Sequence, residues 1–579
     1  MKKIQKFFEK HTIAKIVGIT IFIAIVLTWI FNAGAFQGTE FLDYGKNRLG
    51  FNDIPSIVYN SIYFAIDKII YLLVLGGFYA VLSKTNGYNK IVSSIVKKIK
   101  GKEHIFAVIV AVVIAALTSI TTSTFAMMLF IPLLITIMLN AGLNKLTAFA
   151  STFGALLVGT LGATLGADAL INFDLYFSQQ LAETGAEATL KYRIIILCIS
   201  AALYSFFLFF TAKKAMTNKK KEEIADEFKI EEAGKKEKVK TLPIIITLSV
   251  LAVITLLGFI NWSGTFNIEI FNNFHEWLTG IKIGKDFNIV ANILGTNATA
   301  LGAFDLFTIS TVILVFTVLI AILYSIKFDD LLSTFGSGIV RVIKPVGTLI
   351  AVYCVFMIVY MSPIVPTMVK SIMHKDGIAD LNIDYNGTGY AFFNIDQDDD
   401  GKADYNLINQ DTDKDGKCDL NCDTNKDGYP DKYLDLNADG VSDKNDEEII
   451  AQLGEGTSTN NLDVDGDGIP DTNIDTDFSL PKTIIASIIT NTLHVDAGYT
   501  GYALGGFLVT GFGNFAFAIV FLVFFAIYGL LQFFVPTSVL LMLGLTYAKV
   551  EYKDWMKFIW RFILGMLCVL LIIFIFMVM

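Results

Sequence analysis

Residues 105–140 read IFAVIVAVVIAALTSITTSTFAMMLFIPLLITIMLN, a long apolar run with hydroxyl side chains at its centre. The central part, residues 117–124 (LTSITTST), is mostly Ser and Thr, and residues 535–538 (VPTS) interrupt a second long apolar run. Such breaks leave backbone groups unpaired, which a membrane interior tolerates only inside protein or along a wet cavity. Similar breaks in both halves of a chain indicate inverted repeats around a midplane binding site. We prefer this interpretation to simple helix packing by small residues.

The rest of the sequence also predicts an integral membrane protein. Hydrophobic residues make up 54% of the 579-residue chain, against about 45–50% in soluble domains. Many runs reach the roughly 20 residues that cross a bilayer as a helix. We therefore expect an all-α membrane fold of about ten transmembrane helices, with inverted repeats and re-entrant hairpins. The other apolar runs lie near 16–31, 62–82, 147–172, 190–212, 241–260, 306–326, 345–366, 483–500, 503–534 and 559–579.

The charged residues divide the chain into an acidic segment and a basic remainder. Residues 375–480 contain 28 Asp and Glu but only 7 Lys, whereas the remainder is basic. Basic connections at 84–102, 213–240, 327–344 and 549–561 are expected in the cytoplasm by the positive-inside rule. Residues 375–480 then lie outside a bacterial cytoplasmic membrane. The expected domains are a first carrier part at 1–374, an acidic insert at 375–480 and a second carrier part at 481–579.

The N-terminal run leaves an alternative open. A basic start and Ala33-Gly34-Ala35 after residues 16–31 match a cleavable signal peptide. We favour an uncleaved first span, because the chain that follows is itself a membrane protein.

The acidic insert contains a repeated motif, D-x-[DN]-x-D-G-x-x-D, which begins at Asp396, Asp411, Asp423, Asp435 and Asp463. Oxygens at alternate positions of a tight loop converge on Ca²⁺, and the glycine permits the turn. The expected ligands are Asp396, Asp398, Asp400, Asp404, Asp411, Asp413, Asp415, Asp419, Asp423, Asn425, Asp427, Asp431, Asp435, Asn437, Asp439, Asp443, Asp463, Asp465, Asp467 and Asp471.

The repeats lack the bidentate Glu of an EF-hand and resemble thrombospondin type-3 or related bacterial calcium repeats. Such sites suit extracellular calcium, roughly 0.1–1 mM. Cys418 and Cys422 lie in the same insert and can form a disulfide if it is outside the cell. A solvated acidic linker is the alternative interpretation.

Two stretches of the membrane body resemble a known family. Residues 73–103 (LVLGGFYAVLSKTNGYNKIVSSIVKKIKGKE) and 534–558 (FVPTSVLLMLGLTYAKVEYKDWMKF) are similar to segments of the DcuC/YfcC-type anaerobic dicarboxylate carriers of the ion-transporter superfamily. The resemblance implies a secondary carrier in which each repeat has one re-entrant hairpin and one broken helix. It places the first hairpin tip at Thr118–Thr124 and the second at Pro536–Ser538, with 490–514 as the other break of the second repeat.

The candidate substrate site follows from these breaks. Hydroxyls and helix N-termini at the tips can bind an anion, and a cotransported cation needs carboxylate or amide oxygens. The expected residues are Thr118, Ser119, Thr121, Thr122, Ser123, Asp168, Asn172, Asn491, Asp496, Pro536, Thr537 and Ser538.

One basic residue stands well inside a span, Lys68, beside Asp67. The pair either neutralises itself or lies near the membrane interface, and we favour the interface. Without a buried cation, a dicarboxylate is not favoured over an amino-acid-like or neutral solute.

We therefore expect a secondary transporter of a small organic solute, coupled to H⁺ or Na⁺, with bound Ca²⁺ in the insert. The expected partners are the lipid bilayer and a small-molecule substrate but no nucleic acid, and a homodimer stays open. The chain shows no nucleophilic triad or nucleotide-binding motif, so an enzyme is not expected. The alternatives are a calcium-dependent cell-surface or adhesion membrane protein, or a channel.

Overall fold

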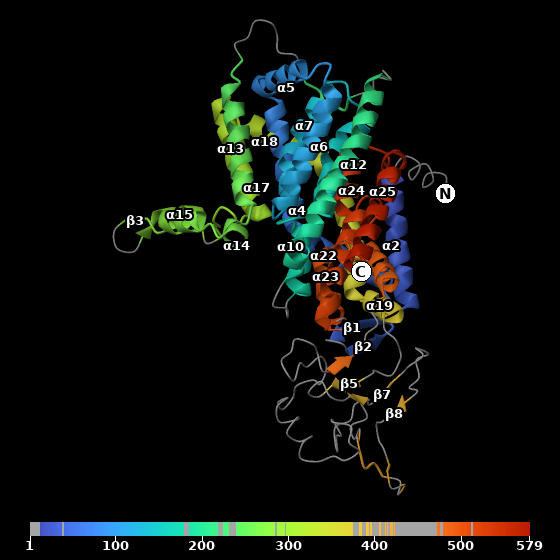
Figure 1. Cartoon of the computed structure of the whole chain (residues 1–579). Helices are drawn as coiled ribbons and strands as arrows, with labels where there is room; N and C mark the ends of the chain where they lie inside the picture. The colour runs from blue at the N-terminus through green and yellow to red at the C-terminus, as the bar shows by residue number, and fades with distance from the viewer. Residues whose placement is uncertain are drawn as a thin grey trace. The chain divides into compact units, whose positions relative to one another are not determined.

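Seven helices in the described part of the computed structural model are long and apolar enough to cross a membrane: α2 (Thr12–Ile30), α4 (Ile66–Ser83), α6 (Glu103–Ile120), α12 (Leu190–Thr217), α17 (Leu306–Leu323), α18 (Phe328–Met361) and α25 (Tyr552–Val578). Shorter apolar helices lie between them (Figure 1). The predicted class, an all-α integral membrane protein, is confirmed.

The chain divides into two units, which we describe separately. Unit 1 comprises Met1–Val369, Thr483–Phe507 and Ala518–Met579, and unit 2 comprises Lys370–Lys482 and Leu508–Phe517. The structure describes residues 12–37, 40–178, 184–217, 224–230, 239–283, 287–295, 297–373, 381–384, 390–392, 394–395, 405–406, 411–412, 414, 417–420, 422, 472–474, 479–510 and 513–578.

The first repeat of unit 1 combines a hairpin and a broken helix. Its shorter elements are α5 (Asn86–Lys98), η2 (Ala126–Phe130), α7 (Ile131–Asn140), α8 (Lys145–Phe149), the π-helical turn η3 (Ala150–Gly154), α9 (Ala155–Leu161), α10 (Asp168–Phe177) and α11 (Gly185–Ala188). The basic helix α5 begins at Thr85, whose hydroxyl accepts a hydrogen bond from the Tyr88 amide. This N-cap starts the helix that forms most of the basic connection at 84–102.

The chain reverses between α6 and α7. The start of α6 follows α5, and α7 returns to pack against α5. Residues 121–125 form the turn at the opposite end of this hairpin. Next, α8, η3 and α9 form a helix that breaks at 162–167 before α10 continues it. The first hairpin therefore lies where the sequence and the resemblance place it.

The second repeat comprises α21 (Leu480–Leu493), α22 (Ala497–Thr510), α23 (Gly513–Leu531) and α24 (Val539–Ala548). Gly529 lies against Leu161, and Gly544 against Phe153 and Phe149. The chain thus keeps one direction from α23 to α24, antiparallel to α8–α9. Residues 532–538 are consequently the break of a broken helix.

The second hairpin has its turn at 494–496. The side chain of Ser487 donates to the carbonyl oxygen of Val523, and Asn491 to that of Phe524, so α21 runs alongside α23. After the turn, α22 runs back along α10, with Gly501 at Phe173 and Gly505 at Phe177. The resemblance put this tip at Pro536–Ser538. The structure instead has the hairpin turn at 494–496 and the broken helix at 532–538. The two could not be told apart in the sequence, because both segments interrupt apolar runs.

The remaining elements of unit 1 connect or flank these repeats. Near the N-terminus, α2 is followed by the antiparallel pair β1 (Ala33–Gln37) and β2 (Glu40–Gly45), η1 (Phe51–Asp53) and α3 (Ile54–Phe64). Between the repeats lie η4 (Asp226–Phe228), α13 (Leu242–Gly258), α14 (Trp262–Phe266), α15 (Ile270–Thr279), β3 (Lys282–Ile283), β4 (Phe287–Asn288), α16 (Ile289–Leu294) and α19 (Val365–Met373). Helices α17 and α18 both pack on α4.

The described part of unit 2 contains short strands, one disulfide and the adjoining ends of α19, α21, α22 and α23. Strand β5 (Leu381–Asp384) pairs antiparallel with β6 (Tyr390–Phe392) and β9 (Thr472–Ile474), and β7 (Asn394–Ile395) pairs with β8 (Tyr405–Asn406). Cys418 and Cys422 are joined by a disulfide.

Close packing of α4 on α18 yields the first testable prediction. A Cβ added at Gly338 would lie 2.3 Å from the carbonyl oxygen of Gly76, so Gly338→Ala must push the two helices apart. We expect a loss on the order of 1–3 kcal/mol, seen as a lower thermal unfolding temperature in detergent.

Gly347→Ala on the same helix is the matched control, because nothing lies within 4 Å of its added Cβ. It should preserve or raise stability, since alanine favours helix by about 1 kcal/mol. Equal unfolding temperatures for the two variants would contradict the packing argument.

Candidate functional site

Hydrogen bonds join the breaks of each half in pairs. In the first half, the carbonyl oxygen of Ser119 accepts from the Thr164 and Gly166 amides at 2.9 and 3.0 Å, and that of Thr121 accepts from the Ala167 amide. In the second half, the Thr537 hydroxyl donates to the Thr492 carbonyl oxygen at 2.8 Å. These bonds satisfy backbone groups that lie outside regular helix. In each half, hydrogen bonds therefore hold the two breaks together in a fixed arrangement.

A buried arginine completes the first pair. Arg193 is 1% exposed on α12. Its Nη1 donates to the carbonyl oxygens of Ala163 and Thr164 at 2.6 and 2.7 Å, and its Nη2 donates to that of Ala186. A guanidinium at a helix C-terminus satisfies its last carbonyls and offsets its dipole. The sequence analysis missed Arg193, although a charge inside the apolar run 190–212 was a signal.

The four breaks surround a polar cavity of about 80 Å³. Its polar wall residues come from α4, from α18, from the breaks and from the helices on either side of them, which brings distant parts of the sequence together. They are Lys68, Thr124, Thr160, Asp168, Asn172, Tyr353, Asp496, Tyr528 and Gln532.

Asp168 and Asp496 both stand at the start of a helix, Asp168 after the broken helix of the first half and Asp496 at the hairpin turn of the second. Each is followed by alanine. One oxygen of Asp168 accepts from the Thr124 hydroxyl at 2.8 Å and from the Ala169 amide at 3.0 Å. One oxygen of Asp496 accepts from the Gly498 amide at 2.7 Å. Each carboxylate is held at a helix N-terminus, where the helix dipole favours negative charge.

Lys68 is a cation in the wall of this cavity. Its Nζ lies 3.2 Å from an Asp67 oxygen. It also lies 5.8 Å from the ring centroid of Phe125 and 6.0 Å from that of Tyr353. The sequence favours a place near the interface for this pair, whereas Lys68 lies in the cavity wall beside the breaks. The direction of the Lys68 side chain depends on its position around α4, which the sequence of an isolated lysine in an apolar run does not reveal.

A wider cavity of about 380 Å³ adjoins the polar one. The two share Lys68, Asn172, Tyr353 and Asp496 as wall residues. Aromatic rings line the rest of it: Phe64, Tyr176, Phe356, Tyr360, Tyr499 and Tyr502. Tyr502 is 67% exposed and Tyr360 is 44% exposed, so this cavity leads out of the protein on that side.

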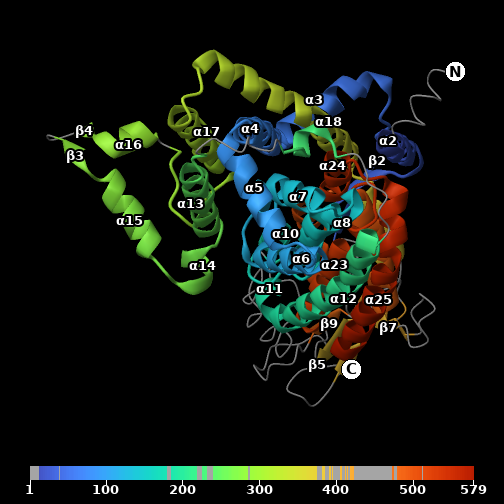
Figure 2. The same ribbon diagram turned by 90° about the horizontal axis from the view of Figure 1, so that it is seen from above.

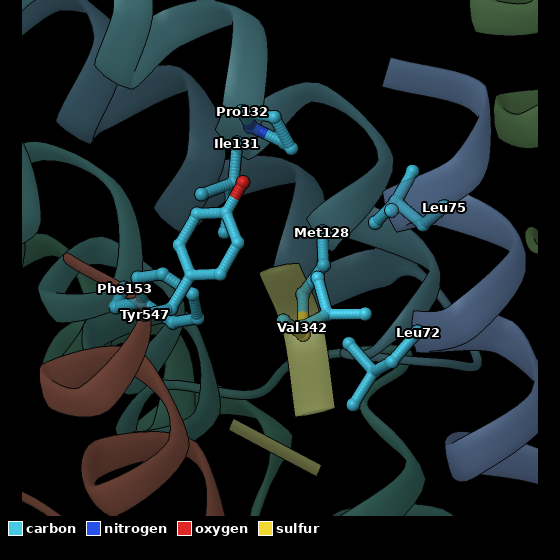
Figure 3. Close-up of a pocket in the computed structure, with 9 residues that line it drawn as sticks. Leu72, Leu75, Met128, Ile131, Pro132, Phe153, Val342 and Tyr547 are labelled. Carbon is cyan, nitrogen blue, oxygen red and sulfur yellow. The ribbon is translucent and has the colours of Figure 1, made fainter. Parts of the chain in front are cut away.

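On the other side of the polar cavity, the wall becomes apolar. Figure 3 shows a small cavity lined by Leu72, Leu75, Met128, Ile131, Val342 and Tyr547, among others. Seen along the helices, α4, α7, α18 and α24 lie next to one another there (Figure 2). Helix α4 carries Lys68 in the polar cavity, Leu72 in the apolar one and Tyr79 in a further cavity beyond. The structure is therefore open on one side of the polar cavity and narrow on the other.

Of the predicted site residues, Asp168, Asn172 and Asp496 line the polar cavity. Thr118, Ser119, Thr121, Thr122, Ser123, Asn491, Pro536, Thr537 and Ser538 are not among its wall residues. Several of these hold the breaks. Thr122 bonds to the Phe259 carbonyl oxygen through both its amide and its hydroxyl, and Ser538 caps α24. Their neighbours Thr124, Gln532, Val539 and Leu540 face the cavity instead.

Only two of the predicted calcium ligands are described. The Thr412 amide and hydroxyl both donate to Asp419 Oδ2 at 2.8 Å, so position 9 of the motif that begins at Asp411 closes on position 2. The other predicted ligands lie outside the described residues: Asp396, Asp398, Asp400, Asp404, Asp413, Asp415, Asp423, Asn425, Asp427, Asp431, Asp435, Asn437, Asp439, Asp443, Asp463, Asp465, Asp467 and Asp471.

Comparison with known proteins adds a family relationship. Residues 10–374 match the profile of the DcuC family, described as C4-dicarboxylate anaerobic carrier. Among solved structures, the YdaH transporter of Alcanivorax borkumensis is similar at 11% identity and a TM-score of 0.35, covering 97% of this chain and 96% of that one. No curated protein sequence matches the chain.

Proposed function

We propose, from the premise that the chain belongs to the DcuC family of C4-dicarboxylate anaerobic carriers, that it is a secondary transporter of small dicarboxylates in a bacterial cytoplasmic membrane. The observation that carries the proposal is Lys68 in a polar cavity enclosed by four helix breaks. A channel needs a continuous polar path, whereas apolar side chains follow the polar cavity on one side.

The cavity offers complementary partners for a dicarboxylate. Lys68 can bind one carboxylate as an ion pair. Helix α24 begins at the cavity with Val539 and Leu540, so its N-terminal amides can bind the other. The hydroxyl of Thr124 and the amides of Asn172 and Gln532 line the space between them. A neutral solute would leave Lys68 unpaired apart from Asp67, which disfavours it.

Replacing Lys68 tests the substrate class. Lys68→Gln removes a charged hydrogen-bond donor worth about 1.5–3 kcal/mol, so the half-saturating dicarboxylate concentration should rise about 10- to 100-fold. The measurement is uptake of labelled succinate into proteoliposomes, beside glutamate and dipeptides.

Lys191→Gln is the control, because it removes the same charge from an exposed position on α12 outside the cavity. Succinate uptake that is equal in Lys68→Gln and the unaltered chain would refute the dicarboxylate assignment.

We further propose that Asp168 and Asp496 bind the coupling ion, H⁺ or Na⁺. Both line the polar cavity, each lies beside a break, and their carboxylate oxygens suit a bound cation. Asp168 contacts Thr124 at the first hairpin turn and Asp496 lies in the second. Binding of a cation there would be linked to closure of both hairpins.

Neutralising these carboxylates should separate coupling from binding. Asp168→Asn and Asp496→Asn should lose gradient-driven accumulation but keep solute exchange, because exchange needs no net movement of the coupling ion. Uptake under an imposed pH gradient or Na⁺ gradient identifies the ion. Asp305→Asn is the control, since asparagine preserves the N-cap of α17 away from the cavity. Accumulation retained in both cavity variants would exclude this role.

The insert is proposed to be an extracytoplasmic calcium-binding segment. Five copies of the motif lie within residues 375–480, and the described part of the second copy closes as a loop with Lys414 in the left-handed conformation. The Cys418–Cys422 disulfide agrees with an oxidising compartment. By the positive-inside rule, the basic residues of α5, with Arg341 and Lys549, are proposed to lie on the cytoplasmic side.

Calcium titration of the full chain tests this assignment. We expect binding at roughly 0.1–1 mM Ca²⁺, measured by isothermal titration against a chain that lacks residues 375–480. Asp411→Asn combined with Asp419→Asn should remove one of the sites. If the deleted chain binds as much Ca²⁺ as the full chain, the insert is not the binding segment.

A further inference from the structure

A second polar cavity, of about 70 Å³, lies beyond the apolar one at the end that carries α5. Three cations line it: Arg341 and Lys344 on α18, and Lys549 at the end of α24. Hydroxyls lie among them, from Tyr79, Tyr88, Thr136 and Thr546. No ion pair in the described part of the chain involves Arg341 or Lys344. This inner cavity therefore combines positive charge with a polar wall.

The described segment 224–230, between α12 and α13, reaches into this inner cavity. Phe228 is 4% exposed, and its ring centroid lies 5.8 Å from that of Tyr547. Its carbonyl oxygen accepts from Asn140 Nδ2 at 2.7 Å. Glu227 and Phe228 both belong to the cavity wall. The buried ring thus holds an otherwise polar segment against the end of the hairpin.

One acidic side chain of this segment meets a cation of the cavity wall. An oxygen of Glu227 lies 2.7 Å from Lys549 Nζ. Its neighbour Asp226 is exposed and pairs with Lys229 of the same segment, whose hydrogen bond and charge lower the pKa of Asp226. The Glu227 carboxylate thereby occupies a site suited to a free carboxylate.

We propose that the inner cavity is a second binding site for the dicarboxylate at the cytoplasmic side, and that Glu227 occupies it as a tethered competitor. The ligand class rests on the proposed function. The path supports this role: along α4 and α18, a solute that leaves Lys68 and passes the apolar layer next meets Arg341 and Lys549.

A tether gives such a competitor a high effective concentration, on the order of millimolar for a short linker. A free dicarboxylate displaces it only at a comparable concentration. Segment 224–230 would thus close the inner cavity when the cytoplasmic solute is scarce and leave it when the solute is abundant. The rate of carrier turnover would then depend on the concentration of the solute in the cytoplasm.

A thiol reporter in the inner cavity tests the proposal without relying on transport. Thr546→Cys is introduced into the full chain with Cys198, Cys354 and Cys568 replaced by serine, and the protein is placed in nanodiscs. The probe is sodium 2-sulfonatoethyl methanethiosulfonate, an anionic thiol reagent. Glu227→Gln with Phe228→Ala should raise the labelling rate at least tenfold. Succinate at millimolar concentration should then slow it, whereas the neutral succinamide should not.

The control is Glu551→Gln, which removes a carboxylate from a 2.6 Å ion pair with Lys553 outside the cavity. It should leave labelling unchanged. An unchanged rate in the Glu227→Gln, Phe228→Ala chain would overturn the competitor. If labelling becomes faster but succinate does not slow it, the anion site is overturned. The anion site is also overturned if succinate slows labelling to the same extent with and without Arg341→Gln. Failure of the proposed function would instead appear in the uptake measurements on Lys68→Gln.

Discussion

Backbone polar groups at membrane depth must find partners within the protein, and this constraint shapes unit 1. An unsatisfied group in hydrocarbon costs several kcal/mol. The breaks meet this need in pairs, through Ser119 with Thr164 and Gly166 in the first half and Thr537 with Thr492 in the second. Arg193 adds charged donors to carbonyls that no helix amide reaches. The polar cavity exists because these segments hold their shape without being helical.

The same constraint separates two kinds of polar residue at the breaks. Residues of one kind, such as Thr122 and Ser538, form side-chain hydrogen bonds with backbone groups. The other kind, such as Asp168 and Gln532, faces the cavity. Thr124 belongs to both kinds, since its hydroxyl fixes Asp168 while it lines the cavity. Substitutions of residues that bond to backbone groups should lower folding stability. Substitutions of residues that face the cavity should change binding of the solute.

Most of the fold could be predicted from the sequence, because apolar length and loop charge depend on simple transfer energies. Residues 117–124 and 535–538 proved to lie at breaks for the same reason. The facing of individual side chains could not be predicted, because a break has no 3.6-residue period to follow. Thr118 and Thr124 look alike in sequence, yet only Thr124 lines the cavity. Which break is a hairpin turn depends on packing such as Gly544 on Phe153.

Charge at the polar cavity gives the proposed coupling a physical basis. Lys68 faces Asp67, Asp168 and Asp496, so the group carries more negative than positive charge when all four are ionised. Two unit charges 4 Å apart interact by about 4 kcal/mol at an effective dielectric constant of 20. Under the proposed function, a dianion brought to this cavity would be repelled until a cation neutralises Asp168 or Asp496. A bound cation would lower this repulsion, so each ligand would raise the affinity for the other.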